Sequence, residues 1–254
     1  MKKKKGLTLT EILIAIAVVG VIAVVSGMII NTNIRKTEIE TKLKQTISVL
    51  NRALYRAITD NGPAYTWNAV INKDSSSRDR FEYFNKYLMP YLHILKPPKV
   101  TSLQELGYPN GIKQANGGTW SIVGENYKDK MIFLNDGTII LNTVFSASCT
   151  NKNCSNTTIT SVQHTIDING PKGPNVYGKD VFNYSVNLIS DVPTFHMAGT
   201  LYFDANSYET TGEVTIGEYS RSTLIANCKG QGFYCGALIE KNGWKIPNDY
   251  PLKL

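Results

Sequence analysis

The feature that most constrains this chain is a long aliphatic run at residues 12–30, preceded by four consecutive lysines at residues 2–5. At 1.5 Å per residue, about 19 helical residues span about 30 Å, the thickness of the hydrocarbon core of a bilayer. Lysines on one flank of such a run hold that flank in the cytoplasm. The sequence therefore predicts a single membrane crossing, with the N-terminus cytoplasmic and the residues after 30 on the far side.

The end of this run does not look like a secretory cleavage site. It passes through Ser26 and Gly27 into Asn31 and then into a charged helical pattern, whereas a signal peptide would end in small residues. The rest of the chain is rich in Asn, Thr, Ser, Tyr and Gly. One membrane anchor followed by one polar head is the simplest division.

The charge of the chain gives little support to a nucleic-acid partner. The four leader lysines account for four of the seven net positive charges, so the remainder carries only +3. The sequence contains no nucleic-acid-binding motif and no run of basic residues interleaved with aromatic ones. Nucleic acid is therefore not an expected partner.

Glu11 lies at the start of the apolar run, where an ionised carboxylate is costly. Near hydrocarbon it costs a few kcal/mol unless it is paired or reaches the interface. Two interpretations follow. Either Glu11 extends to the cytoplasmic surface of the bilayer, or a positive charge compensates it.

The residues around Glu11 favour the second interpretation. The segment KGLTLTE at residues 5–11, followed by ILIAIAVVG, resembles the class III signal of type IV prepilins and the related pseudopilins. The resemblance implies that a prepilin peptidase cuts after Gly6 and methylates the new amine on Leu7. Glu11 stands at the position of the hallmark glutamate of the family. Leu7 replaces the more common phenylalanine, and the kinking proline of many major pilins is missing, with Met28 near its place.

This resemblance implies that Glu11 pairs with the N-terminal amine of a neighbouring subunit and that the chain assembles into a filament. Cleavage creates a cationic amine beside hydrocarbon, and the glutamate of a neighbouring subunit can neutralise it, so that assembly removes the cost of both charges. The implied partners are other pilin subunits, the prepilin peptidase and an inner-membrane assembly platform. The competing interpretation is an ordinary signal anchor in which Glu11 is an incidental interfacial residue.

The helix is expected to continue beyond the membrane. Aliphatic residues recur at three- and four-residue steps from Ile39 to Ile58, and Asn61-Gly62-Pro63 supplies a stop. One helix from about residue 8 to residue 60 is predicted, with two helices broken near 31–33 as the alternative.

We divide the chain into a leader at 1–6, a transmembrane half-helix at 7–30, an amphipathic half-helix at 31–62 and an extracytoplasmic head at 63–254.

The head is predicted to be α+β, with the long N-terminal helix packed on an antiparallel sheet. Aromatic residues at helical spacing suggest a second helix within 80–95, ended or kinked by Pro90. Residues 131–134 and 138–141 flank Asn135-Asp136-Gly137, which is a strong hairpin signal. Further strands are expected near 119–123, 161–168, 181–188, 200–203 and 223–226.

The four cysteines form two close pairs, Cys149 with Cys154 and Cys228 with Cys235. Outside the cytoplasm, two small disulfide loops are favoured. A four-thiolate zinc site and cross-pairing between the two segments are the alternatives.

The segment at 167–182 looks like a loop in the heads of many pilin-like proteins, as does GWKIPNDYP at 243–251. In the first, Asp167, Asn169, Asn175 and Asp180 offer oxygen ligands that would suit calcium. A strand connection built from Asn, Asp, Gly and Pro without any metal is the alternative. The chain lacks the full spacing of an EF-hand loop.

No enzyme is predicted, because His93, His164 and His196 are scattered and no nucleophile or phosphate-binding motif appears. The expected function is a structural subunit of a type IV pilus-like filament. The size of the head favours a minor or specialised role. A pseudopilin of a type II secretion system and a membrane-anchored adhesion or binding module are the alternatives.

Overall fold

The computed structural model describes residues 9–67, 84–119, 128–149, 157–190, 192–204 and 215–254, without the side chains of residues 23–31 and of several strand ends. The chain divides into two compact units, Met1–Glu38 with Leu254, and Ile39–Lys253. Among the described residues, no helix is both long enough and apolar enough to cross a membrane.

Helix α1 is one element that runs from Leu9 to Asn61, as predicted, and the alternative of two helices is wrong. It ends where Gly62 adopts a positive φ of 80° and Pro63 removes a backbone donor. The aliphatic stripe of its second half is buried, apart from Ile58, which is partly exposed. The fully buried members of this face are Ile39, Leu43, Thr46, Ile47, Leu50, Ala53, Leu54 and Ala57.

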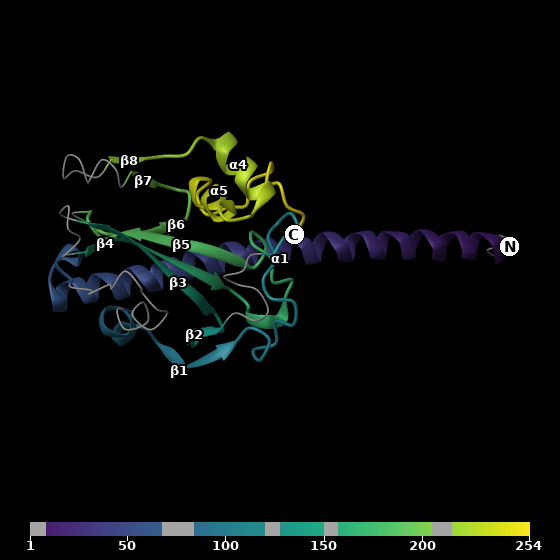
Figure 1. Ribbon diagram of the computed structural model, residues 1–254. Coiled ribbons are helices and arrows are strands. Elements are labelled where there is room, and N and C mark those ends of the chain that lie inside the picture. Colours follow the sequence, from purple (N-terminus) through teal and green to yellow (C-terminus); the bar gives the residue numbers. More distant parts are fainter. Residues whose placement is uncertain (1–8, 68–83, 120–127, 150–156, 191, 205–214) are drawn as a thin grey trace. The chain divides into compact units, whose positions relative to one another are not determined.

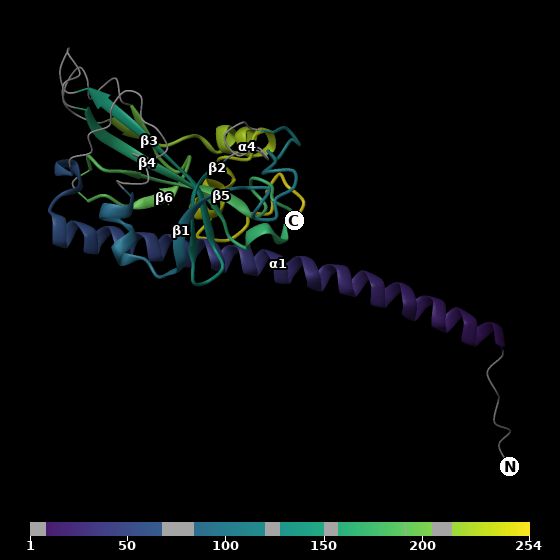
Figure 2. The ribbon, with the colours of Figure 1, turned by 60° about the horizontal axis from the view of Figure 1, so that its bottom comes forward.

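Six strands form one antiparallel sheet in the order β1-β2-β3-β4-β5-β6 (Figure 1), so each strand pairs with its neighbours in sequence. The strands are β1 (Ile94–Ser102), β2 (Lys128–Leu134), β3 (Ile139–Cys149), β4 (Thr157–Asp167), β5 (Val181–Asn187) and β6 (Phe195–Met197). The second half of α1 packs against this sheet, as Figure 2 also shows. The predicted α+β class is therefore confirmed.

The predicted hairpin joins β2 to β3. The amide of Leu134 donates to the carbonyl of Thr138 at 2.9 Å, and Gly137 occupies the turn with a φ of 88°. Asp136 closes the turn from the side, because its Oδ1 accepts the amide of Thr138 at 3.0 Å. The strands predicted near 161–168 and 181–188 correspond to β4 and β5.

The helix predicted within 80–95 is confirmed in part, since residues 80–83 lie outside the described residues and no helix continues past Tyr91. From Phe84 the chain forms one helical turn, then the 3-10 helix η2 (Met89–Tyr91), and β1 begins at Ile94. Pro90 lies inside η2, where the short turn needs no interior donor. Four of the predicted side chains are nevertheless buried in the core: Phe84, Tyr87, Leu88 and Leu92.

The C-terminal part adds a small sheet of β7 (Tyr202–Asp204) and β8 (Thr215–Gly217), and the helices α4 (Arg221–Gly230) and α5 (Cys235–Lys241). The strand predicted at 200–203 corresponds to β7. The strand predicted at 223–226 is wrong, because these residues belong to α4. Ser220 caps that helix by accepting the amide of Thr223 at 3.2 Å.

The strand predicted at 119–123 lies largely outside the described residues, and Thr119 forms an isolated bridge with Lys113.

A compact cluster fills the head between β2, β3 and the start of β5. It includes two large aromatic residues, Tyr108 and Tyr177, and neither is exposed. Phe233 packs against it with a ring-centroid distance of 4.7 Å to Tyr177. The other members are Leu103, Ile112, Met131, Ile139, Leu141 and Val181.

Candidate functional site

Three residues are predicted to serve in processing and assembly, and of these only Glu11 lies in the described part of the chain. Gly6 and Leu7 lie outside the described residues. Glu11 lies in the first turn of the helix, where a carboxylate interacts favourably with the helix dipole. The large aliphatic side chains that follow it are exposed, from 43 % at Ile12 to 65 % at Val21. This part of the helix therefore presents an apolar surface with one carboxylate near its start.

The second half of α1 is held to the sheet by polar contacts as well as by its buried stripe. The hydroxyl of Tyr184 in β5 donates to the carbonyl of Leu43 at 3.2 Å. At the β2–β3 turn, the Lys42 ammonium donates to the carbonyl of Asp136 at 2.6 Å and lies 3.5 Å from its carboxylate. Both contacts join residues that are more than ninety positions apart in the sequence.

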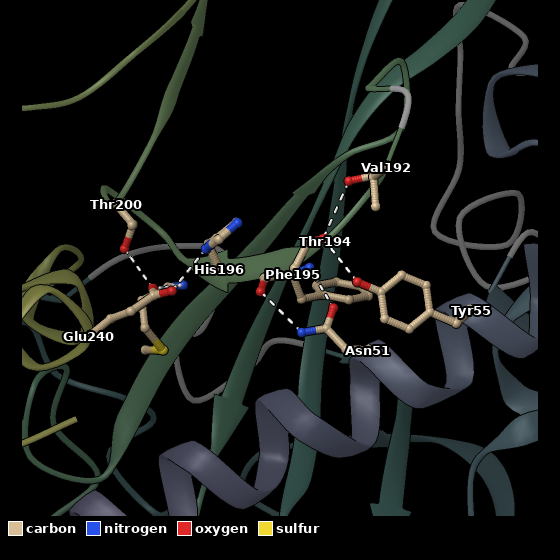
Figure 3. Close-up of polar contacts among 9 residues, drawn as sticks. Asn51, Tyr55, Val192, Thr194, Phe195, His196, Thr200 and Glu240 are labelled. Carbon is tan, nitrogen blue, oxygen red and sulfur yellow. Dashed lines mark hydrogen bonds and ion pairs between the residues drawn. The ribbon is translucent and has the colours of Figure 1, made fainter. Parts of the chain in front are cut away.

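Strand β6 lies between two helices that bind its backbone with side chains (Figure 3). The amide group of Asn51 in α1 accepts the N–H of Phe195 at 2.7 Å and donates to its carbonyl at 3.3 Å. The Asn51 side chain thus makes the two backbone hydrogen bonds that a neighbouring strand would otherwise make with Phe195. A little further along α1, the hydroxyl of Tyr55 lies 3.2 Å from that of Thr194.

Glu240 of α5 binds the other end of β6. Its carboxylate accepts the amide of Met197 at 2.7 Å and the hydroxyl of Thr200 at 2.7 Å, and it lies 2.8 Å from Nδ1 of His196. The Glu240 side chain is 13 % exposed. Burial with three partners makes this carboxylate a structural anchor for the strand.

The loop at 167–182 and the C-terminal segment at 243–251 meet in the structure. The hydroxyl of Tyr250 donates to the carbonyl of Gly178 at 2.6 Å. Gly178 has a φ of 83°, and a Cβ there would overlap Cys235. The C-terminal segment also contacts α1, since Glu40 accepts the amide of Ile246 at 2.9 Å and the Lys245 ammonium at 2.7 Å. The loop at 167–182 and the C-terminal segment at 243–251 thus form one cluster.

A cavity of about 650 Å³ lies beside the second half of α1. Its walls come from the helix, the β2–β3 turn and the C-terminal segment, and they include Lys44, Arg52, Asp136 and Trp244. Sequence reasoning missed this cavity because it depends on the packing of three distant segments.

Cys228 and Cys235 form a disulfide, as predicted, with Cα atoms 4.6 Å apart. It joins α4 to α5, and both cysteines are fully buried. Cys154 lies outside the described residues, so its predicted pairing with Cys149 stays a prediction. The zinc alternative needed all four thiolates, and it is wrong because two of them are joined to each other.

The three histidines occupy separate places. His93 is exposed and His196 binds Glu240, whereas His164 is fully buried between the rings of Phe84 and Phe195. Burial lowers the pKa of His164 to about 3. Its Nδ1 lies 2.9 Å from the hydroxyl of Thr143. His164 is therefore a neutral core residue.

The four predicted calcium ligands lie together in the loop between β4 and β5. Asp167 and Asp180 are buried, and Asn169 and Asn175 lie between them in sequence. Within the described part of the chain, no three His, Cys, Asp or Glu residues form a group that could hold a metal. Any cation at this loop would therefore need the amide oxygens as well as the two carboxylates.

Two models of known protein families match this chain. A model of the prokaryotic N-terminal methylation motif matches residues 1–27, which supports a protein of the type IV pilin-like class. A second family model, described as a family of unknown function (DUF6613), matches residues 29–254, and the chain belongs to that family. No curated protein and no solved structure matches the chain.

Proposed function

We propose that this chain is a structural, non-catalytic subunit of a type IV pilus-like filament, in a minor or specialised role. It is processed after Gly6, and it assembles through its N-terminal helix. The observation that carries the proposal is the position of Glu11, within the methylation motif and in the first turn of α1. The aliphatic residues beside it are exposed in the single chain, which suits burial among other subunits.

Localisation follows from the same proposal. The leader lysines hold the N-terminus in the cytoplasm, residues 7–30 lie in the inner membrane before assembly, and the head lies outside the cytoplasm. The Cys228–Cys235 disulfide supports this placement of the head, because disulfides persist in oxidising compartments.

The first experiment is the intact mass and N-terminal sequence of the protein, recovered from membranes of cells with and without the prepilin peptidase. We expect a chain that begins at methylated Leu7 only when the peptidase is present. An uncut Met1, or a cut after the apolar run, would overturn the proposal and leave an ordinary anchored or secreted protein.

A second experiment tests the role of Glu11 directly. Glu11→Ala should reduce incorporation into sheared filaments at least about tenfold, because the methylated amine of the next subunit would lose its partner. The matched control is Glu38→Ala on the same helix, which removes an exposed carboxylate beyond the apolar run. Equal incorporation of both variants would contradict the proposed charge pair.

Two alternatives use the same helix. A pseudopilin of a type II secretion system would make deletion strains lose a secreted protein while surface filaments stay intact. A membrane-anchored adhesion or binding module would leave both intact and lose attachment to a surface. The first measurement on a deletion strain is therefore a parallel comparison of filaments, secreted proteins and adhesion.

A further inference from the structure

The cavity of about 650 Å³ beside the second half of α1 has no role in the proposed function. All its lining residues belong to the larger compact unit, so the cavity lies within one unit. One wall is the face of α1 that carries Lys44, Ser48 and Arg52, which follow each other at four-residue steps and lie on one side of the helix. Binding sites for small ligands usually measure about 300–1,000 Å³, so this cavity is large enough for a ligand of several rings.

Both carboxylates in the cavity wall already have a positive partner. Glu40 lies 2.7 Å from the ammonium of Lys245, and its other oxygen accepts the amide of Ile246 at 2.9 Å. Asp136 lies 3.5 Å from the ammonium of Lys42. These pairs leave little negative charge in the wall to repel an anion.

Two cations in the same wall lack such a partner among the described residues. Lys44 and Arg52 line the cavity and are exposed, and neither forms an ion pair with the described part of the chain. The Nε of Arg52 donates to the carbonyl of Ser48 at 3.4 Å, which leaves the two terminal nitrogens of the guanidinium available. The Cα atoms of the two cations are about 12 Å apart, because eight helical residues rise 1.5 Å each. The wall therefore carries a net positive charge over a length that suits two acidic groups of one ligand.

Trp244 lines the opposite side of the cavity in a strained conformation. Its φ is 65°, which a bulky residue rarely adopts, and its backbone amide donates to the carbonyl of Ile239 at 2.9 Å. The side chain is half-buried, and its indole N–H has no hydrogen-bond partner among the described residues. Strain of this kind gathers at binding sites. The indole thus offers the cavity an apolar face and one available donor.

The remaining walls are rich in neutral polar side chains. Thr41, Gln45, Ser48 and Asn135 provide hydroxyl and amide groups that both donate and accept hydrogen bonds. Such groups match the hydroxyls of a sugar, which also do both. A peptide suits the cavity less well, because the backbone groups of the α1 wall are bonded within the helix and would leave the peptide backbone with few partners.

We propose that this cavity binds an acidic oligosaccharide. Lys44 and Arg52 pair with its carboxylates, the indole of Trp244 packs against the face of one sugar ring, and the neutral side chains bind its hydroxyls. The inference concerns the head alone. It holds whether or not the chain is cut after Gly6 and assembles through Glu11.

Calorimetric titration of the full chain, in a detergent without a sugar headgroup, tests the proposal. The acidic probes are tetragalacturonic acid and a hyaluronan tetrasaccharide, and the neutral control is maltotetraose. We expect an acidic probe to bind at one site per chain, at least about tenfold more tightly than maltotetraose. No heat from either acidic probe at millimolar concentration would overturn the proposal, and so would equal affinity for maltotetraose.

A hexaglutamate peptide separates an acidic saccharide from other polyanions. It should bind at least about tenfold more weakly than the better acidic saccharide, because it offers no ring face to Trp244 and no hydroxyl groups. Equal binding of the peptide would overturn the assignment to a saccharide.

The charge variant is Lys44→Gln combined with Arg52→Gln. Loss of both cations should raise the dissociation constant of the acidic probe at least about tenfold, while the head still unfolds cooperatively because both side chains are exposed. The matched control is Arg56→Gln combined with Lys229→Gln, which removes the same charge from exposed helical positions outside the cavity wall. Equal affinities of the two double variants would contradict this site.

Trp244→Gly tests the aromatic wall. Glycine adopts a φ of 65° freely, so the change removes the indole and relieves the backbone strain. We expect the same loss of affinity for the acidic probe, and loss of the change in tryptophan fluorescence that the probe produces in the wild type. Binding of the probe with wild-type affinity by this variant would show that the proposed site is wrong.

Discussion

The two halves of α1 differ in what they do with their apolar side chains. In the first half, aliphatic residues such as Leu13 and Ile16 are 59 % and 64 % exposed. In the second half, Leu43 and Leu54 are fully buried under the sheet. Both halves are helical and rich in aliphatic residues. Among the described residues, the second half packs on the sheet, whereas the large aliphatic side chains of residues 12–22 are exposed.

This difference teaches that one helix serves two kinds of association. Burial of a leucine contributes about 1.5–3 kcal/mol, and the second half uses that contribution to hold the head together. The exposed aliphatic side chains of the first half leave the same contribution available for an apolar partner, which in our proposal is the bilayer or another subunit. Substitutions in the second half should therefore lower the stability of the head, whereas substitutions in the first half should leave that stability nearly unchanged.

The largest difference is expected between Leu54→Ala and Leu13→Ala. Leu54 has no exposed surface, so its truncation should lower the free energy of unfolding by about 2–5 kcal/mol. Leu13→Ala should change it by less than about 0.5 kcal/mol, because the side chain is exposed. Urea unfolding followed by tryptophan fluorescence measures both. Similar losses of unfolding free energy for Leu54→Ala and Leu13→Ala would contradict the difference between the two halves of α1.

Acid should weaken the head through His164, which lies under the second half of α1. The folded-state pKa of about 3 is below the unfolded value, so the unfolded chain binds more protons below pH 6.5. Stability from this residue is present above that pH and falls as the pH drops toward 3, by up to about 1.4 kcal/mol per pH unit.

The measurement compares the pH dependence of unfolding for the wild type and His164→Leu, so that contributions from other groups cancel. We expect a flatter acid limb in the variant. His93→Leu is the control, since His93 is exposed and its loss should leave the slope unchanged. Identical slopes in the wild type and His164→Leu would contradict the neutral buried state.

Loss of the Cys228–Cys235 disulfide should have an intermediate effect. The bond closes a short loop of sequence separation seven, for which chain entropy predicts a contribution of about 2 kcal/mol. Replacing both cysteines by alanine should lower the unfolding temperature of the head. It should not change the processing of Gly6, which belongs to the other compact unit. A processing defect would show that the two regions are coupled.

The smallest effects should come from the polar face of the second half. Asn51→Ala removes two hydrogen bonds to Phe195 and should cost about 1–2 kcal/mol. Tyr55→Phe removes one exposed contact to Thr194 and should cost less than about 0.5 kcal/mol. Thermal unfolding of both variants gives the comparison, and an equal cost would mean that Asn51 does not hold β6.

The sequence predicted those elements whose signals are local. The periodic aliphatic residues of α1, the Asn135-Asp136-Gly137 turn and the strands β4 and β5 are all indicated by neighbouring residues in the chain. The assembly motif was also readable, because Gly6, Leu7 and Glu11 lie within six residues. The strand predicted near 223–226 is wrong: Thr223 and Ile225 favour strands, but they lie in α4, whose first turn is capped by Ser220.

The rest depends on contacts that no local pattern reports. Asn51 and Glu240 reach β6 across 144 and 43 positions in the sequence, and neither residue belongs to a motif. The same holds for Glu40, which binds the C-terminal segment. Composition alone predicts Asp167, Asn169, Asn175 and Asp180 as calcium ligands, and this stays a prediction; the burial of the two carboxylates could be learned only from the structure.

Both outer strands of the six-stranded sheet resist pairing with a strand of another molecule. Strand β1 contains Pro97 and Pro98 between exposed lysines, and the free backbone of β6 is occupied by the side chains of Asn51 and Glu240. Open sheet edges are a common route to amyloid-like aggregation. The edges of this sheet therefore leave few backbone groups to which a strand of a neighbouring head could pair.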